Sequence, residues 1–263
     1  MGGETVSAAP GNGWAPRTLI ALHLAAAALL ASWWIEPTRA LLWQPMDDAL
    51  FRLLNGSLGG MPEWWSHFWA FANTRPFDAL SAVLMLGLYT LYILGDRRAE
   101  MAKRMAELLF MLLAVTGAMA LAEETLMNVD RDSPTLVLGT EYRLSWMYPE
   151  FHKLKDASGS SFPSNHGVVL LTWTAYLWIT AGRRFGLAAT ALSCLFLLPR
   201  MIGGGHWLTD TLVGGTFVTL ITLAWLFATP LQGWGVRLLT PAMRPIAWAA
   251  ERVLNLFWKI ERP

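Results

Sequence analysis

The sequence predicts an all-α membrane protein: a polytopic bundle of six transmembrane helices with further helices in the membrane interface. Of its 263 residues, 54% are hydrophobic and only 15% are charged, whereas soluble domains usually carry about 25% charged residues. The mean hydropathy is +0.38. The chain also has 15 Trp residues, a type that concentrates at membrane–water interfaces. A net charge of +1 gives no indication of a nucleic-acid partner.

Six apolar segments are long enough to cross a bilayer, for which about 20 apolar residues are needed. They cover residues 17–35, 78–95, 105–124, 164–182, 186–202 and 207–229. We expect helices, because backbone polar groups in lipid must find their partners within the segment. The fifth segment is short for a span, so we expect its C-terminal end to be buried in protein.

The chain divides into three parts. Residues 1–16 form a short polar tail without a basic start, so no cleavable signal peptide is expected. Residues 17–230 form the six-helix membrane domain, with a Trp-rich interfacial segment at 36–77 and a long outer connection at 125–163. We expect one or two short interfacial helices within 36–77. Residues 231–263 alternate apolar and basic residues, which predicts an amphipathic cytoplasmic helix.

Basic residues predict the orientation, because short cytoplasmic connections are enriched in Lys and Arg. Two connections and the C-terminal tail share one side, and their basic residues are Arg97, Arg98, Lys103, Arg104, Arg183, Arg184, Arg237, Arg244, Arg252 and Lys259. This side is expected to be cytoplasmic and to hold both termini. The interfacial segment and the outer connection then face the periplasm of a bacterial inner membrane.

Four polar clusters fall at span ends on the outer side. They are residues 131–134, residues 161–167, Arg200, and His206 with Asp210. Arginine makes bidentate contacts to phosphate oxygens. Glycines at 203–205 are expected to expose backbone N–H groups at a helix start, where anions are favoured. The clusters together predict a site for a multiply charged anion.

His206 and Asp210 are four residues apart, which predicts that they share one helix face. A carboxylate in that position can hold one ring nitrogen and leave the other as a nucleophile. The alternative is a His–Asp pair that only caps a helix.

His166 follows Pro163, a residue suited to a helix start. Ser164 would cap this helix or bind a phosphate through its hydroxyl. His166 would lie in the first turn, where it could protonate a leaving oxygen. The alternative is an interfacial His bonded to water or backbone.

These clusters resemble the three motifs of the type 2 phosphatidic acid phosphatase superfamily, Lys-x6-Arg-Pro, Pro-Ser-Gly-His and Ser-Arg-x5-His-x3-Asp. The third motif matches at Arg200, His206 and Asp210. The second matches at 163–166, with Asn in the Gly position. The first is degenerate, because Glu124 stands at the Lys position and the Pro comes three residues after the Arg.

The resemblance implies that His206 attacks phosphorus and forms a phosphohistidine. Asp210 would orient His206, and His166 would act as general acid and then as base. The implied phosphate contacts are Arg131, Arg200, Ser164, Asn165 and Gly167, and Lys155 is our candidate for the missing Lys. No metal or cofactor is implied, because cationic side chains and backbone amides can stabilise the charge. Glu124 is expected to point away from the site or to pair with a cation.

Further blocks at 73–78, 131–136, 155–158 and 199–210 resemble one branch, the lipid A phosphotransferases of Gram-negative inner membranes. This branch implies transfer of a phosphoryl group from undecaprenyl pyrophosphate to the 1-phosphate of lipid A at the periplasmic face. Both lipids lie in the outer leaflet, so we expect sideways access through 36–77. Arg75 and Asp78 are candidates for acceptor recognition, with an ordinary ion pair or helix cap as the alternative.

Two other functions are compatible with the sequence. A phosphatase acting on undecaprenyl pyrophosphate or another lipid phosphate would use the same residues, although the missing motif Lys and the branch-specific blocks favour the transferase. A non-catalytic lipid-binding or transport protein could line a passage with His and Arg, because ionisable residues in membranes are often functional without being catalytic. The complete set of Arg200, His166, His206 and Asp210 argues against it.

Overall fold

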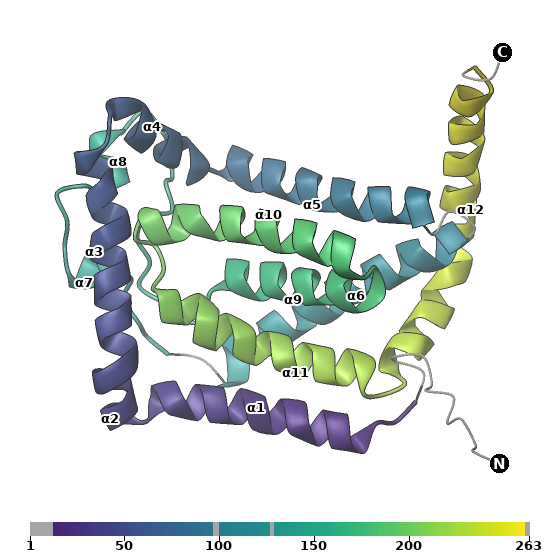
Figure 1. Ribbon diagram of the computed structural model, residues 1–263, viewed down its shortest axis with the longest axis horizontal. Helices are drawn as coiled ribbons and strands as arrows, with labels where there is room; N and C mark the ends of the chain where they lie inside the picture. Colours follow the sequence, from purple (N-terminus) through teal and green to yellow (C-terminus); the bar gives the residue numbers. More distant parts are fainter. Residues whose placement is uncertain (1–12, 97–99, 127–128, 261–263) are drawn as a thin grey trace.

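The structure is a computed structural model that describes residues 13–96, 100–126 and 129–260. All regular secondary structure in this part of the chain is helical, which confirms the predicted all-α class (Figure 1). The longer helices are α1 (Pro16–Trp34), α3 (Gln44–Gly60), α4 (Glu63–Ala72), α5 (Arg75–Asp96), α6 (Met101–Leu121), α9 (Asn165–Thr180), α10 (Arg183–Ile202), α11 (Thr216–Phe227) and α12 (Leu231–Ile260). Short helices are α2 (Glu36–Thr38), α7 (Pro134–Val137) and α8 (Leu144–Met147), and π-helical turns are η1 (Arg39–Trp43), η3 (Ala122–Leu126) and η4 (Asp210–Gly215).

Five helices of the described chain are long and apolar enough to cross a membrane. They are Pro16–Trp34, Arg75–Gly95, Met101–Glu124, Arg183–Ile202 and Asp210–Phe227. The predicted fourth span is α9, which has 16 residues and is therefore about 24 Å long. It lies inside the bundle against α10, α11 and η4. The structure thus confirms a membrane helical bundle but not the number of six spans.

The segment 36–77 forms two main helices, α3 and α4, and α3 is the longer of them. Their location in the membrane interface stays a prediction. Figure 1 shows α3 crossing one end of the bundle at a steep angle to the long helices. Its buried residues, Asp47, Phe51, Asn55 and Leu58, recur at helical spacing and face the bundle. The amide of Asn55 donates to the carbonyl of Ile202 at 3.0 Å, which ties α3 to the end of α10.

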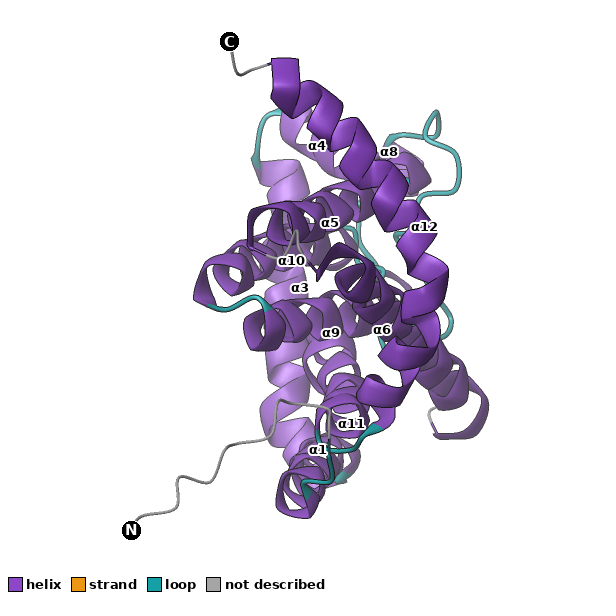
Figure 2. Ribbon diagram, turned by 90° about the vertical axis from the view of Figure 1, so that its right-hand side faces the viewer, coloured by secondary structure: helices purple, strands orange, loops and turns teal. Residues whose placement is uncertain are grey.

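The C-terminal part forms one helix, α12, which crosses the opposite end of the bundle (Figures 1 and 2). It packs chiefly against α6, and a Cβ atom on Gly235 would clash with the ring of Phe110. Trp234, Leu238 and Trp248 are exposed, as expected for an amphipathic helix against a membrane. The predicted cytoplasmic residues Arg97 and Arg98 lie outside the described part, and the orientation stays a prediction.

Candidate active site

His206 lies in the turn between α10 and the next helix, which begins at Leu208. Its Nδ1 atom is 2.9 Å from the carbonyl oxygen of Ser161 and 3.4 Å from Oδ2 of Asp210. The prediction that His206 and Asp210 share one helix face was wrong, because His206 precedes the helix. The predicted contact nevertheless exists. An Nδ1–H group directed at these acceptors leaves Nε2 with a free lone pair, as a nucleophile requires.

The carboxylate of Asp210 is fully buried and contacts His206, Trp207 and Arg131. Its Oδ2 atom accepts a hydrogen bond of 2.8 Å from the backbone N–H of Trp207, and its Oδ1 atom accepts one of 2.5 Å from Arg131. The bond to Trp207 closes the first turn of the helix and caps its N-terminus. Asp210 therefore combines both roles considered from the sequence, a cap and a partner of His206.

The glycines before His206 shape a tight turn. The N–H groups of Gly205 and His206 both donate to the carbonyl of Arg200, at 2.9 and 3.2 Å, and those of Gly203 and Gly204 donate to other carbonyls of α10. The expectation that this turn presents free N–H groups to an anion was therefore wrong. Gly204 has a φ of +77°, and a Cβ atom on Gly205 would clash with the carbonyl oxygen of Lys155. These glycines allow close backbone approach.

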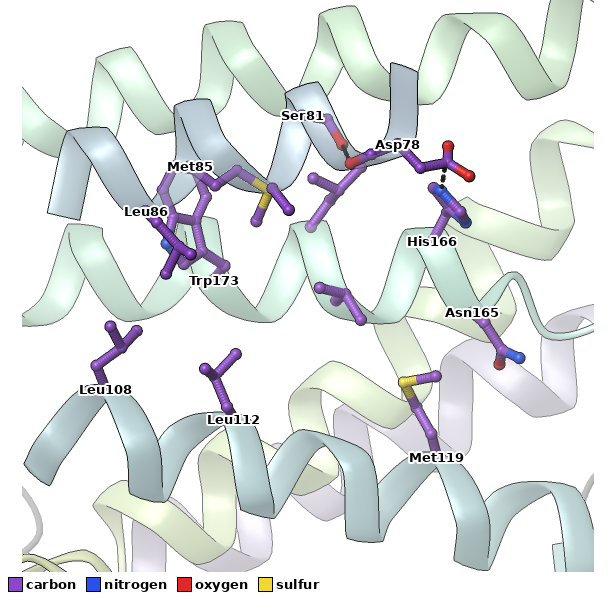
Figure 3. A pocket seen from close by; sticks show the side chains of 13 residues that line it. Asp78, Ser81, Met85, Leu86, Leu108, Leu112, Met119, Asn165, His166 and Trp173 are labelled. Carbon is purple, nitrogen blue, oxygen red and sulfur yellow. Dashed lines mark hydrogen bonds and ion pairs between the residues drawn. The ribbon is translucent and has the colours of Figure 1, made fainter. Parts of the chain in front are cut away.

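A cluster of three cationic or ionisable groups surrounds Asp78 in the first turn of α5. Its Oδ1 atom is 2.6 Å from Arg200 and 3.2 Å from Nε2 of His166, and its Oδ2 atom is 2.7 Å from Nζ of Lys155. Figure 3 shows Asp78 and His166 facing each other. Asp78, a candidate for acceptor recognition, thus pairs with His166 and with two of the predicted phosphate contacts, Arg200 and Lys155. The role of Lys155 as the replacement for the motif Lys stays a prediction.

Arg200 is held in place by the backbone and side chain of Asn73, the residue that follows α4. Only 3% of Arg200 is exposed. Its guanidinium donates to Oδ1 of Asn73 at 3.0 Å and to the carbonyl of Asn73 at 3.3 Å. Asn73 in turn donates to the carbonyl of Pro199 at 2.8 Å. These contacts fix the orientation of the guanidinium before an anion binds.

Arg131 is already paired with protein groups around Asp210. Its guanidinium donates to Asp210 at 2.5 Å, to Oγ1 of Thr209 at 2.8 Å and to Asp47 at 2.7 Å. It also stacks between two indoles, 5.3 Å from the ring centre of Trp33 and 5.1 Å from that of Trp207. A direct contact of Arg131 with phosphate stays a prediction from the motif.

Asp47 is a site residue that the sequence analysis missed. It comes from α3, is 1% exposed, and accepts hydrogen bonds from Thr209 as well as Arg131. Burial raises the pKa of its carboxyl, and the hydrogen bonds from Thr209 and the charge of Arg131 lower it in part. Its only sequence signal was an acidic residue on the buried face of an amphipathic helix.

The remaining residues of the second motif have local roles. Ser164 caps α9 by accepting a hydrogen bond of 3.1 Å from the N–H of Gly167. A Cβ atom on Gly167 would lie 3.0 Å from the methyl group of Thr211, so the glycine lets α9 approach η4 closely. Asn165 donates to Glu123 at 2.6 Å. Contacts of these three residues with phosphate stay predictions.

Two further charged residues were considered from the sequence. Arg75 is exposed at the first position of α5, three residues before Asp78. Glu124 is exposed as well, and its position relative to the phosphate stays a prediction. In the described part of the chain, no group of three or more His, Cys, Asp or Glu could hold a metal ion. Metal independence itself stays a prediction.

An apolar cavity of about 490 Å³ adjoins His166 and Asp78 (Figure 3). It extends between α5, α6 and α9, and its lining includes Ser81, Ala82, Met85, Leu86, Leu108, Leu112, Met119 and Trp173. No residue of the segment 36–77 lines it. The cavity next to His166 therefore opens between long helices. A second cavity of about 450 Å³ beside Arg131 and Trp207 is lined by residues of the segment 36–77, including Arg39, Gln44 and Asp47, so access through this segment stays a prediction.

Comparison with known proteins identifies the family of the chain. The model of the PAP2 superfamily matches residues 79–232. The chain is also 33% identical to lipid A 1-diphosphate synthase of Escherichia coli (strain K12) over 216 residues, which cover 81% of this chain and 88% of the relative. The chain belongs to the PAP2 superfamily. No solved structure gave a significant match. Family membership and the helical bundle together identify a membrane enzyme of the lipid phosphatase and phosphotransferase class.

Proposed function

We propose that this PAP2 enzyme transfers the terminal phosphoryl group of undecaprenyl pyrophosphate to the 1-phosphate of lipid A, at the periplasmic face of a bacterial inner membrane. The observation that carries the choice of reaction is the similarity to lipid A 1-diphosphate synthase over 81% of the chain. The choice of nucleophile rests on the contacts of His206, whose Nδ1 atom is occupied by Ser161 and Asp210.

In the first step, the lone pair on Nε2 of His206 attacks the terminal phosphorus of the donor. A P–N bond forms while the bond to the bridging oxygen breaks, and undecaprenyl phosphate leaves with a proton supplied by His166. Arg200 and Lys155 stabilise the charge on the phosphoryl oxygens during this displacement. Both cations form ion pairs with Asp78 before substrate binds. An incoming phosphate therefore competes with that carboxylate for them.

In the second step, an oxygen of the acceptor phosphate attacks the phosphohistidine. The P–N bond breaks, His206 regains its lone pair, and His166 takes any proton that the acceptor releases. The product is a diphosphate on lipid A, and the enzyme returns to its starting state. The acceptor alone decides the outcome, because attack by water on the same intermediate would make the enzyme a phosphatase.

The apolar cavity supports a lipid substrate whose chain lies in the membrane. Its polar end is formed by Asp78, Asn165 and His166, and its remaining lining is mostly aliphatic. A phosphate group at the polar end would lie beside the proposed acid His166, while an isoprenoid or acyl chain fills the apolar part. This arrangement matches the form of most ligand sites, which combine apolar walls with a few polar groups.

The test is to incubate the purified protein in mixed micelles with undecaprenyl pyrophosphate labelled on its terminal phosphate, with and without lipid A. We expect label on lipid A with the unmodified protein and none with His206→Ala. Label released only as inorganic phosphate would establish the phosphatase instead. Label left on the donor by the unmodified protein would contradict catalysis and favour a lipid-binding or transport protein.

A further inference from the structure

The carboxylate of Asp47 reaches from the interfacial helix α3 into the turn that carries the nucleophile. Oδ1 accepts a hydrogen bond of 2.9 Å from the backbone N–H of Thr209, and Oδ2 accepts one of 2.6 Å from the Thr209 hydroxyl. The same Oδ2 atom accepts a hydrogen bond of 2.7 Å from Arg131. Asp47 and Thr209 are each at most 1% exposed, so these contacts are shielded from water.

The contacts continue from Arg131 to His206. One nitrogen of the guanidinium bonds Asp47 and the other bonds Asp210, and Asp210 lies 3.4 Å from Nδ1 of His206. The planar guanidinium suits this bridging role, because its nitrogens point in fixed directions. The guanidinium also lies over the rings of Trp33 and Trp207, and these contacts restrict its position.

A neutral side chain can hold α3 against the bundle. Asn55 lies on the same buried face of α3 and makes a neutral hydrogen bond to Ile202. Burying a carboxylate is costly unless it is paired and hydrogen-bonded. The carboxylate of Asp47 therefore indicates a role beyond holding α3 against the bundle. The only cation within hydrogen-bond distance of Asp47 in the described structure is Arg131.

We propose that Asp47 is a positioning residue that holds Arg131 between two carboxylates and thereby preserves the negative charge of Asp210 for His206. This inference rests on the proposed phosphotransfer. If Arg131 were paired with Asp210 alone, its positive charge would neutralise the negative charge of Asp210. With Asp47 the three groups carry a net charge of −1, which favours the positive charge that the His206 ring gains when Nε2 bonds phosphorus.

The test compares Asp47→Asn with Asp48→Asn, a matched change at the next position of the same helix. We expect Asp47→Asn to lower kcat for transfer by about tenfold, the size expected for the loss of a hydrogen bond to a charged group, while the donor KM changes by less than about twofold. Asp48→Asn should leave both constants at the unmodified level. Asp47→Glu, which keeps the charge, should recover much of the lost kcat.

A double-mutant cycle with Arg131→Gln separates this role from a merely structural one. In the Arg131→Gln background, adding Asp47→Asn should lower kcat by less than about a further twofold. The reason is that either change alone already breaks the contacts that run from Asp47 through Arg131 to Asp210. The inference is overturned if the two losses multiply, if Asp47→Glu is no better than Asp47→Asn, or if Asp47→Asn equals the unmodified protein. Absence of transfer by the unmodified protein would instead refute the proposed function.

Discussion

The Nδ1 atom of His206 lies 2.9 Å from the carbonyl oxygen of Ser161, closer than to the carboxylate of Asp210 at 3.4 Å. A backbone carbonyl only accepts hydrogen bonds, so it selects the tautomer with the proton on Nδ1. The tautomer that leaves Nε2 free is therefore held by two acceptors, one of which no side-chain substitution can remove.

This arrangement predicts unequal losses at His206 and Asp210. His206→Ala removes the nucleophile, and we expect kcat to fall by at least about 10⁴-fold. Asp210→Asn removes the charge but leaves the Ser161 carbonyl to hold the tautomer, so we expect a smaller fall of about a hundredfold. The transfer assay with labelled donor measures both. Equal losses would mean that Asp210 alone holds the tautomer.

The pH dependence follows from the opposite proton requirements of the two histidines. His206 must be neutral to attack and His166 must be protonated to donate, so we expect a bell-shaped profile of kcat/KM against pH. In His166→Asn, the fall on the alkaline side should disappear and the remaining activity should be low. A profile for the unmodified protein that changes in one direction only, between about pH 5 and 9, would contradict these assignments.

Lys155 should take the place of the Lys that the first motif lacks. Its ammonium lies 2.7 Å from Asp78 within the cluster of Arg200 and His166. A hydrogen bond to a charged group contributes about 1.5 to 3 kcal/mol, so Lys155→Ala should lower kcat/KM by about tenfold to a hundredfold. The exposed Lys153 provides the control. If Lys153→Gln and Lys155→Ala had equal effects, a specific role of Lys155 would be excluded.

The apolar cavity predicts a dependence on the length of the lipid chain. Ala82 lines the cavity, whereas the neighbouring Val83 is 64% exposed and is not among the residues that line it. We expect Ala82→Trp to raise KM for undecaprenyl pyrophosphate by about tenfold, equivalent to about 1.4 kcal/mol of binding, and Val83→Trp to leave it unchanged. A donor with a much shorter chain should be less affected. Equal effects on long and short donors would argue against a chain in this cavity.

The turn before His206 should tolerate no side chain at Gly205. A Cβ atom there would clash with the carbonyl oxygen of Lys155, and overpacking of this kind costs about 1 to 3 kcal/mol. We expect Gly205→Ala to lower Tm and activity together. Gly87 on α5 has open space around it, so Gly87→Ala is the control and should leave both unchanged.

Most of the fold was predictable because the membrane restricts it. The apolar segments match α1, α5, α6, α10 and η4 with α11 in order. The length of α9 was not predictable, because its apolar run continues into the turn after Thr180 while the helix ends there. Hydropathy measures which residues tolerate lipid, and this central helix is buried mainly by its protein neighbours.

Some residues of the candidate site were also predictable from the sequence, and others were not. His206, Asp210, Arg200 and His166 were identified because their types and spacings match a motif. Asp47 could not be identified, because it is 162 positions from Thr209 and only the folded chain brings them together. The carbonyl of Ser161 could not be identified either, because every residue has one. The glycine turn was misjudged, since sequence does not reveal which N–H groups are already bonded.

A search for the phosphohistidine tests whether His206 is the nucleophile. The unmodified protein is mixed with labelled undecaprenyl pyrophosphate without acceptor, quenched within the first turnover, and digested for mass spectrometry. We predict label on the peptide that contains His206, stable to base, labile to acid, and lost when lipid A is added before the quench. Label on another residue, or direct transfer to lipid A by His206→Ala, would contradict the account.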